Sequence, residues 1–449
     1  MDGVRLFVDE GLGHSSYLVD LGDGTAAIVD PPRFPTEHLA TARTSGLAPR
    51  WTIDTHSHAD YVTGSPSLAT DDDVTFIAPA ASKLETPYRA VRDEELIGLA
   101  PGVALRAIGT PGHTPDHHVY LVERDGSPVS LFTGGSLMVG AVGRTDLCGP
   151  DLAEPLAHEM FHSLRRLDGL PDDLAVYPTH GAGSFCSAPG GADRTTTLGR
   201  ERATNALFRI DDEDTFVEQL LAGFGSFPTY FARLPELNRR GPPHYSQLPR
   251  LDRLDVDAVN QHVKAGALVV DARPISEFSA GHVPGSISNA LRPVFASWLG
   301  WIADLDRPVV ILADADQDRD EIVRQALDIG HDNIVGELDG GIDAWRAASR
   351  PIDGIALVAP ADIVGTVIDV RQRNEYETGH VPGAIDIELG SLAHSSIPEG
   401  PVTVMCGHGE RAMTGASILT RRGHRDVSVL DGGPDTWAAW SGQPLVVGR

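Results

Sequence analysis

Short apolar runs alternate with glycine-rich turns and amphipathic stretches along the first 245 residues. Runs rich in aliphatic residues predict strands at Ser16 to Val19, Ala26 to Val29 and Thr52 to Ile53. Apolar residues at helical spacing predict helices at Leu152 to Leu167 and Gly199 to Phe208. This part of the chain therefore mixes strands and helices and reads as one α/β unit.

The C-terminal half contains an internal repeat. The segment Val269 to Arg273 recurs 98 positions later as Val367 to Arg371, and Asp339 to Gly341 recurs 92 positions later as Asp431 to Gly433. The smaller offset means that the first copy carries six additional residues between these landmarks. In each copy, β-branched runs alternate with helical stretches such as Glu321 to Leu327, which is typical of βαβ units on a parallel sheet.

The length of 449 residues suggests about three domains at roughly 150 residues each. Proline and glycine clusters mark the boundaries. We expect one domain over residues 1–245, a second over 256–353 and a third over 357–449. The last two would each be a small α/β domain with a central parallel sheet.

The charge balance limits the class of partner. The chain has 36 basic and 63 acidic residues, a net charge of −27, which argues against nucleic acid or an anionic membrane as a partner. No stretch approaches the roughly 18 to 20 apolar residues that span a bilayer, and Met1 to Arg5 lack an apolar signal core. Three widely spaced cysteines, Cys148, Cys186 and Cys406, fit a reducing compartment. We therefore expect a cytoplasmic protein; a homo-oligomer stays open.

Four histidines stand in a pattern typical of a metal site. His56 and His58 are two residues apart after an apolar run, so both imidazoles can project to one side. His113 and His180 each follow a strand-like run on a loop shaped by proline and glycine, where α/β folds place ligands. Asp60 completes the first motif, which reads His-x-His-x-Asp.

These spacings resemble the metallo-β-lactamase superfamily, with glyoxalase II-like hydrolases and persulfide dioxygenases as its nearest branches. The resemblance implies an αββα sandwich in which His56, His58 and His113 form a first metal site, and Asp60 and His180 belong to a second. The sequence departs from the family pattern twice. Tyr61 replaces a histidine of the second site, and Gly135 replaces a bridging aspartate.

Both departures disfavour a two-metal centre, because Asp60 and His180 alone are too few ligands for a second ion. The prediction is one Fe(II) or Zn(II) ion held by His56, His58 and His113, or a two-histidine site completed by water, with Asp60 orienting a ligand. A degenerate site kept only as scaffold is the alternative. Cys186, six residues beyond His180, could carry a persulfide in the same cleft or be a buried apolar residue. Cys148 has no partner motif and is expected to be structural.

The loop Cys406-Gly407-His408-Gly409-Glu410-Arg411 lies between the apolar run Val402 to Met405 and a helical run, Ala412 to Thr420. A thiolate at the start of such a loop faces the unpaired N–H groups of a helix N-terminus, and the glycines let the backbone curl around it. Arg411 adds a cation for the thiolate or for an incoming anion. This arrangement favours a nucleophile that holds sulfane sulfur as a persulfide.

Together with the repeated Asp-x-Arg and Gly-His-Val-Pro-Gly segments, this loop resembles the rhodanese sulfurtransferases. The resemblance makes Cys406 and Arg411 catalytic, and Gly407, His408, Gly409 and Glu410 the substrate-binding loop. The first copy has Asp314 at the cysteine position and cannot form a persulfide. We interpret that copy as a structural or docking domain.

The whole chain resembles bacterial persulfide dioxygenase–rhodanese fusions. That resemblance implies an enzyme of sulfur metabolism that exchanges sulfane sulfur through Cys406 with small thiols, persulfides or thiosulfate. Its N-terminal domain would act on low-molecular-weight persulfides at the mononuclear metal. Two alternatives stay open: a glyoxalase II-like thioester hydrolase fused to a rhodanese, and a sulfurtransferase whose N-terminal domain is a non-catalytic scaffold.

Overall fold

The computed structural model describes residues 3–71, 73–186 and 193–448. It divides into two compact units, which we describe separately. The N-terminal unit runs to Gln247 and includes Leu327–Gly330, and the C-terminal unit comprises Leu248–Ala326 and His331–Arg449. The predicted domain limits at residues 1 and 449 lie outside the described residues. No helix in the described ranges is long and apolar enough to cross a membrane.

The N-terminal unit contains two six-stranded sheets. The first has the order β1-β2-β3-β4-β5-β6, with strands Val4–Asp9, His14–Asp20, Thr25–Val29, Ala48–Ile53, Thr75–Pro79 and Arg89–Val91. The second has the order β12-β11-β10-β9-β8-β7, and in chain order from β7 its strands are Leu96–Ala100, Val103–Gly109, His118–Arg124, Ser127–Gly134, Ala175–Pro178 and Thr196–Thr197.

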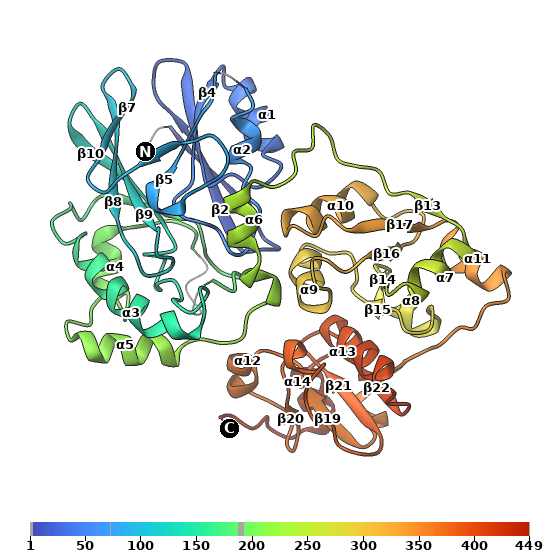
Figure 1. The fold of residues 1–449 in the computed structure, drawn as a ribbon. Helices are drawn as coiled ribbons and strands as arrows, with labels where there is room; N and C mark the ends of the chain where they lie inside the picture. The colour runs from blue at the N-terminus through green and yellow to red at the C-terminus, as the bar shows by residue number, and fades with distance from the viewer. Residues whose placement is uncertain (1–2, 72, 187–192, 449) are drawn as a thin grey trace. The chain divides into compact units, whose positions relative to one another are not determined.

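Helices cover the outer faces of these sheets. They are α1 (Thr36–Thr44), α2 (Ser65–Leu68), α3 (Pro150–Arg165), α4 (Leu198–Thr204), α5 (Glu213–Ala222) and α6 (Leu234–Arg240), with short 3₁₀ turns η1 (Ala80–Ser82) and η2 (Thr229–Ala232). In Figure 1, α3, α4 and α5 lie together on one side of the unit. Their apolar residues pack with the outward-facing residues of the second sheet, such as Leu121 and Val176.

The main core of this unit lies between the two sheets. It joins residues of the first sheet, such as Tyr17 and Ile53, to residues of the second, such as Leu105, Tyr120 and Phe132. Two sheets packed face to face with helices outside make an αββα sandwich. The fold class predicted for this part of the chain is confirmed.

The C-terminal unit contains two five-stranded parallel sheets with corresponding strand orders, β13-β17-β16-β14-β15 and β18-β22-β21-β19-β20. The strands of the first copy are β13 (Arg253–Leu254), β14 (Leu268–Asp271), β15 (Ile287–Ser288), β16 (Val309–Leu312) and β17 (Ile334–Leu338). Those of the second are β18 (Ala356–Val358), β19 (Thr366–Asp369), β20 (Ile385–Asp386), β21 (Val402–Met405) and β22 (Val427–Leu430). The repeat seen in the sequence is therefore a repeat of topology.

The helices of the two copies differ in one place. The first copy has α7 (Val256–Lys264), α8 (Ile275–Ala280), α9 (Phe295–Ile302), α10 (Arg319–Asp328) and α11 (Gly341–Ala347), and the second has η3 (Pro360–Asp362), α12 (Arg373–Thr378), η4 (Leu389–Ser391), α13 (Glu410–Arg421) and α14 (Pro434–Ser441). Between the edge strand β15 and the central strand β16, the first copy forms α9, which has eight residues. Between the corresponding strands β20 and β21, the second copy forms only the three-residue turn η4. Five of the six additional residues of the first copy lie here, and the sixth lies in the loop that follows β16.

Two predicted helices are displaced at their ends. The first was expected over Leu152 to Leu167 and runs over Pro150–Arg165, because Pro150 is well suited to the first turn of a helix. The second was expected to reach Phe208 and ends at Thr204, because the side chain of Asn205 accepts a hydrogen bond from Phe208 N at 3.2 Å. That local bond competes with helix continuation.

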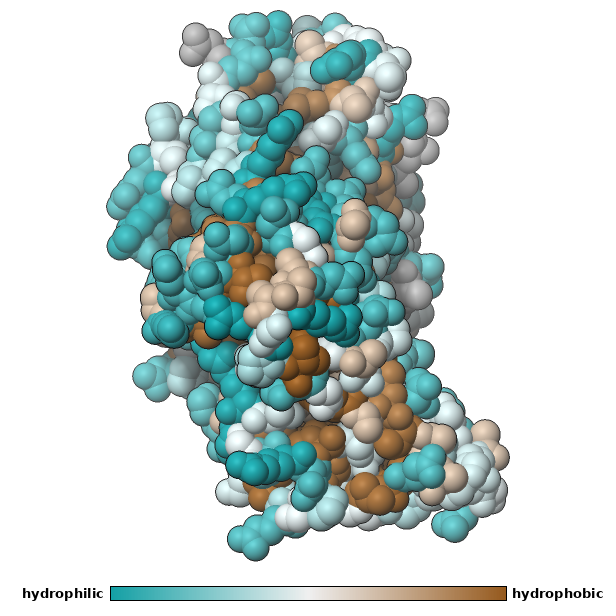
Figure 2. All heavy atoms as spheres, turned by 90° about the vertical axis from the view of Figure 1, so that its right-hand side faces the viewer, coloured by the Kyte–Doolittle hydropathy of each residue, from teal (hydrophilic) through white to brown (hydrophobic). Residues whose placement is uncertain are grey.

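Figure 2 shows one face on which hydrophilic side chains predominate and hydrophobic groups interrupt them. The most exposed large apolar side chains among the described residues include Trp440 at 56% and Val447 at 74%, both near the end of the second copy. Isolated exposed apolar residues of this kind are ordinary on a protein surface.

Candidate functional site

The histidine motif lies on the loop that follows β4. Strands β3, β4 and β5 are parallel, so their carboxyl ends meet at one edge of the sheet. Asp30 follows β3 there and accepts hydrogen bonds from Thr55 N at 2.7 Å and Thr55 Oγ1 at 2.8 Å. Thr179 Oγ1 donates to the same carboxylate. Asp30 therefore ties the loop of His56 to the loop of His180.

The ring nitrogens of His56, His113 and His180 converge. His56 Nε2 and His180 Nε2 are 3.3 Å apart. His113 Nδ1 donates to the carbonyl of Arg144 at 2.8 Å, which leaves Nε2 as a lone-pair nitrogen, and that buried Nε2 has no hydrogen-bond partner among the described residues. Burial lowers the pKa of His113 to about 3, so its ring is neutral at physiological pH. These are the properties of metal-ligating imidazoles.

His58 is oriented differently from the sequence prediction, which grouped it with His56 and His113. Its Nε2 lies 3.1 Å from the hydroxyl of Tyr61 and 3.3 Å from Asp30 Oδ1. Burial would lower the pKa of His58, but the Asp30 carboxylate raises it, which favours a protonated ring. Among the described residues, the grouping that includes His56 and His113 takes His180 as its third member.

Asp60 lies beside His180, with Oδ2 at 3.2 Å from His180 Nδ1. Burial would raise the pKa of Asp60, but His180 lowers it, so the carboxylate stays ionised. His58, Asp60 and His180 form a second group of converging donor atoms. Asp60 is therefore placed either to orient His180 or to act as a ligand itself.

The position of the missing aspartate is closed by histidine rings. A methyl group added at Gly135 would lie 2.6 Å from Cγ and 2.8 Å from Nε2 of His113. The backbone N–H of Gly135 donates to His117 Nε2 at 2.9 Å, and the carbonyl accepts from Gly143 N at 2.8 Å. His113 thus packs directly against a backbone that is fixed on both sides, and no side chain fits there unless the ring moves.

His117 is a site residue that the sequence analysis missed. Its ring stacks on His56 with centroids 4.9 Å apart, and its Nδ1 lies 2.8 Å from Thr110 Oγ1. Burial is the main cause of its pKa lying well below the usual value. In the sequence, His117 is recognisable only as part of the pair His117-His118. Two adjacent histidines do not have the spacing of metal ligands, so the pattern singles out neither residue.

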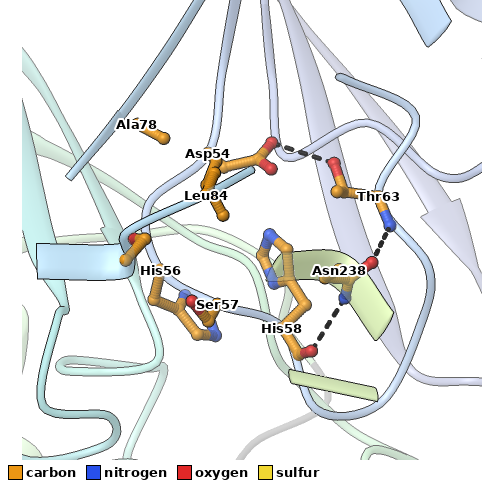
Figure 3. A pocket seen from close by; sticks show the side chains of 9 residues that line it. Asp54, His56, Ser57, His58, Thr63, Ala78, Leu84 and Asn238 are labelled. Atoms are coloured by element: carbon orange, nitrogen blue, oxygen red, sulfur yellow. Dashed lines mark hydrogen bonds between the residues drawn. The ribbon is translucent and has the colours of Figure 1, made fainter. Parts of the chain in front are cut away.

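A small pocket opens beside His58. Figure 3 shows His58 with Asp54, Thr63 and Asn238 along this pocket, and His56 and Ser57 also line it. Asn238 Nδ2 donates to the carbonyl of His58 at 2.9 Å, and Thr63 N donates to Asn238 Oδ1 at 3.1 Å. Burial raises the pKa of Asp54 to about 7. The pocket is lined mainly by polar side chains, and its free volume of about 10 Å³ has room for about one water molecule.

The two cysteines of this unit have opposite environments. Cys186 is fully buried, and its pKa lies well above the usual value because of burial and of the nearby Asp60. A protonated thiol is a poor nucleophile, so persulfide formation at Cys186 is disfavoured. Cys148 was expected to be structural, but its residue is exposed. Burial of its thiol nevertheless raises the pKa of Cys148 to about 11.

The cysteine loop of the second copy joins β21 to α13. Cys406 follows the strand directly and is 1% exposed, and Gly409 N donates to its Sγ at 3.1 Å. Gly409 has φ of 105°, which a glycine adopts readily, and it precedes the first residue of α13, Glu410. Gly407 is half-buried and His408 is exposed. Of the predicted loop residues, Gly409 contacts the thiol directly, and α13 begins at the next residue.

Arg411 is held by an acidic partner that the sequence analysis did not identify. Its Nη1 and Nη2 lie 2.6 Å and 2.8 Å from the two carboxylate oxygens of Glu375. Burial would raise the pKa of Glu375, but Arg411 lowers it. Glu375 stands in the repeated segment after β19, so the repeat marked it as a landmark without indicating its partner.

The corresponding loop of the first copy is closed by its own side chains. The sequence predicts Asp314 at the cysteine position, but Leu312 pairs with Asp271 as Met405 pairs with Asp369, so Ala313 is the residue that follows its strand as Cys406 does. The N–H of Asp314, one residue further on, donates to Gln317 Oε1 at 2.9 Å. Gln317 Nε2 in turn donates to the carbonyl of Ala272 at 2.7 Å. Arg319 pairs with Glu337 at 2.8 Å and also donates to the carbonyl of Asp314. This copy has neither a thiol nor an open loop for an anion.

Similarity to known families agrees with these two sites. Residues 9–180 match the Metallo-beta-lactamase superfamily, and residues 255–348 and 356–440 each match the Rhodanese-like domain. A hydroxyacylglutathione hydrolase of Cupriavidus metallidurans is 31% identical over 175 residues, which are 37% of this chain and 62% of that protein. The chain thus spans about three fifths of that relative. One from Anaeromyxobacter dehalogenans is 31% identical over 229 residues, 45% of this chain and 84% of that protein.

A solved structure extends the likeness beyond the first unit. The crystal structure of a metallo-beta-lactamase from Staphylococcus aureus subsp. aureus COL superposes with a TM-score of 0.64 at 27% identity, covering 75% of this chain and 98% of that one. The matched 75% of this chain is more than its first 247 residues, so the match includes residues of the C-terminal unit. The predicted resemblance of both halves is confirmed. The chain belongs to the metallo-beta-lactamase superfamily and carries two rhodanese-like domains after its metallo-beta-lactamase domain.

Proposed function

We propose that the chain is a sulfurtransferase that carries sulfane sulfur as a persulfide on Cys406. The observation that supports this most strongly is the geometry of one thiol. Cys406 Sγ lies at the carboxyl end of a parallel strand and accepts the Gly409 N–H at 3.1 Å beside the start of α13. A helix N-terminus stabilises negative charge, and an anionic sulfur is the species that attacks and carries sulfur.

The transfer balances as two displacements. The Cys406 thiolate attacks the outer sulfur of thiosulfate, a sulfur–sulfur bond forms to Cys406, and the old sulfur–sulfur bond breaks with its electron pair leaving on sulfite. A small thiolate then attacks the outer sulfur of the Cys406 persulfide, and Cys406 leaves as the thiolate. No external oxidant or reductant is consumed.

The experiment is sulfur transfer from thiosulfate to cyanide, followed as thiocyanate, with the full chain and with Cys406→Ser. We expect activity in the parent chain and none in this variant. Cys186→Ser is the matched control, because that cysteine is also buried but lies in the other unit. Activity that survives Cys406→Ser, or that Cys186→Ser abolishes, would contradict the proposal.

For the metallo-beta-lactamase domain we propose one divalent ion, Fe(II) or Zn(II), and low-molecular-weight persulfides as substrates. His56, His113 and His180 would hold the ion, because three imidazoles suit either metal. The Nε2 atoms of His56 and His180 are 3.3 Å apart, close to the ~3.3 Å between two imidazole nitrogens on one tetrahedral ion. The residues present therefore fit the group. When bound, such an ion polarises a sulfur or carbonyl substrate as a Lewis acid.

This chain's own residues would position the ion and the substrate. Asp60 would orient His180, and the carbonyl of Arg144 fixes the tautomer of His113. Thioester hydrolysis is the alternative that the names of the hydroxyacylglutathione hydrolases favour, but Tyr61 and Gly135 remove ligands that a two-metal hydrolase needs.

Metal content separates these alternatives. The anaerobically purified chain is compared with a His56→Ala, His113→Ala double variant as the blank. Iron that the variant loses, with oxygen uptake on a persulfide, supports the persulfide proposal. Zinc with hydrolysis of a glutathione thioester supports the alternative, and no metal above the blank leaves the domain as a scaffold. The cytoplasmic location and the small-thiol partners remain predictions from the sequence.

A further inference from the structure

The first rhodanese copy packs against the helix that begins at the cysteine loop. At the end of β15, the carbonyl of Ser288 accepts a hydrogen bond from Thr414 Oγ1 at 2.7 Å, and Ser288 N donates to Ser417 Oγ at 3.2 Å. Thr414 and Ser417 are buried on α13. The segment of the first copy that follows β15 therefore starts alongside the helix of the reactive cysteine.

The next helix of the first copy, α9, reaches the loop itself. The ring of Trp298 lies with its centroid 5.7 Å from the guanidinium carbon of Arg411. Trp301 packs where Gly390 of the second copy has no side chain, since an added methyl group there would lie 2.7 Å from Trp301 Cη2. Ile275 Cδ1 would likewise lie 3.0 Å from a methyl group at Gly409. The copy without a nucleophile thus forms one wall of the Cys406 loop.

Arg292 lies in this same segment, between β15 and α9. Its backbone carbonyl is fixed by Phe295 N at 2.9 Å and by Gln325 Nε2 at 3.1 Å. Its guanidinium forms no ion pair and no hydrogen bond with any residue in the described ranges. Burial lowers the pKa of Arg292, and the charges that act on it are those of Glu410, Cys406 and Arg411. The side chain is therefore an uncommitted cation in the field of the cysteine loop.

The cation of the loop itself is already committed. Arg411 is bidentate with Glu375, and so its charge is largely neutralised before any substrate arrives. An incoming dianion needs a cation whose hydrogen-bond donors are unused, and a guanidinium offers five of them in a planar fork. Arg411 spends its donors on Glu375, whereas the guanidinium of Arg292 has no ion pair or hydrogen bond with a residue that the structure describes.

We infer that Arg292, on the copy that lacks the nucleophile, recruits the anionic end of the sulfur donor to Cys406. The donor class is a sulfane sulfur attached to an oxyanion group, as in thiosulfate. Arg292 binds the oxyanion while Cys406 attacks the outer sulfur. The first copy is then a substrate-recruiting domain and not only a structural one. This inference rests on the proposed function of Cys406.

Alkylation of Cys406 tests the recruiting charge without requiring turnover. Iodoacetate and iodoacetamide have the same reacting carbon but differ in charge, and peptide mass spectrometry reads modification at Cys406 alone. The ratio of the two rates therefore reports attraction of an anion to the thiol. We expect Arg292→Gln to lower the iodoacetate-to-iodoacetamide rate ratio about tenfold, because one partly screened cation near the incoming anion is lost. Arg292→Lys keeps the positive charge and should retain most of the parent ratio.

The matched control is Arg350→Gln, an exposed arginine of the same copy that pairs with Asp257. It should leave the ratio unchanged. An unchanged ratio in Arg292→Gln, or an equal fall in Arg350→Gln, would overturn the inference. A fall in both alkylation rates with a constant ratio would also overturn it, because that pattern indicates a structural change at the loop and not a lost charge.

Turnover gives an independent readout. If the parent chain transfers sulfur from thiosulfate, Arg292→Gln should raise KM for thiosulfate about tenfold and change kcat by less than about threefold, because removing a recruiting contact weakens binding more than the chemical step. If the parent chain transfers no sulfur, the proposed function fails, whereas the alkylation ratio still decides the role of Arg292. The two failures are therefore distinguishable.

Discussion

Gly135 gives the sharpest prediction about the histidine cluster. Gly135→Ala adds one methyl group where the backbone cannot retreat, because its N–H is bonded to His117 and its carbonyl to Gly143. The methyl group would lie 2.6 Å from His113 Cγ, well inside ordinary carbon–carbon contact. The ring of His113 must therefore move, and the hydrogen bond from its Nδ1 to the carbonyl of Arg144 is strained or lost.

The magnitude follows from these two effects. Overpacking a well-filled site typically costs about 1–3 kcal/mol, and leaving a buried polar group without its partner costs about 1–3 kcal/mol. We therefore expect Gly135→Ala to destabilise the N-terminal unit by about 2–6 kcal/mol. Any bound metal should also be lost, since His113 is one of the three converging imidazoles.

The control is Gly98→Ala, in β7 of the same unit. Gly98 is exposed, has no heavy atom within 4 Å of an added methyl group, and should tolerate alanine with a change in stability within about 1 kcal/mol. Because the chain has two units, unfolding in urea is followed by hydrogen exchange on peptides from residues 3–247. Equal stability and equal metal content of the two variants would refute the reasoning.

Two further predictions concern the C-terminal unit. Burial would raise the pKa of Glu375, but Arg411 lowers it. The pair therefore stabilises the fold at pH values above the ordinary glutamate pKa, and this stabilisation is lost as the pH falls through the lowered pKa. Because the Glu375 side chain is 38% exposed, Glu375→Gln should lower the free energy of unfolding by no more than about 1 kcal/mol at neutral pH and leave it unchanged in acid. A difference in stability between parent and variant that is the same at all pH values in urea titrations would contradict this. Gly390→Ala should push Trp301 aside and speed hydrogen exchange in α9, and unchanged exchange there would contradict the packing between the copies.

The fold was largely predictable because its signals are local. The predicted apolar runs at Ser16 to Val19 and Ala26 to Val29 lie in strands of the structure, and the repeated Asp-x-Arg segments end β14 and β19, which hold corresponding places in two sheets. Helix ends were less predictable. Asn205 ends α4 through a side-chain hydrogen bond to a residue three positions later, and hydrophobic periodicity carries no information about such a bond.

The candidate site was predictable in its residue types but not in its geometry. The sequence placed His56, His58 and His113 together, but the direction of the His58 ring depends on Tyr61 and Asp30, which come from different loops. Similarly, the position of Arg292 depends on how one copy of a repeat packs on the other. Both are long-range tertiary effects, and residue spacing along the chain does not encode them.

The central claim is that Cys406 carries sulfane sulfur, and the most direct measurement is the mass of the full chain after incubation with thiosulfate and removal of the reagent. We expect one added sulfur atom, located on the Cys406 peptide, removed by cyanide and absent from Cys406→Ser. A parent chain that gains no sulfur, or that gains it equally in Cys406→Ser, would contradict the account.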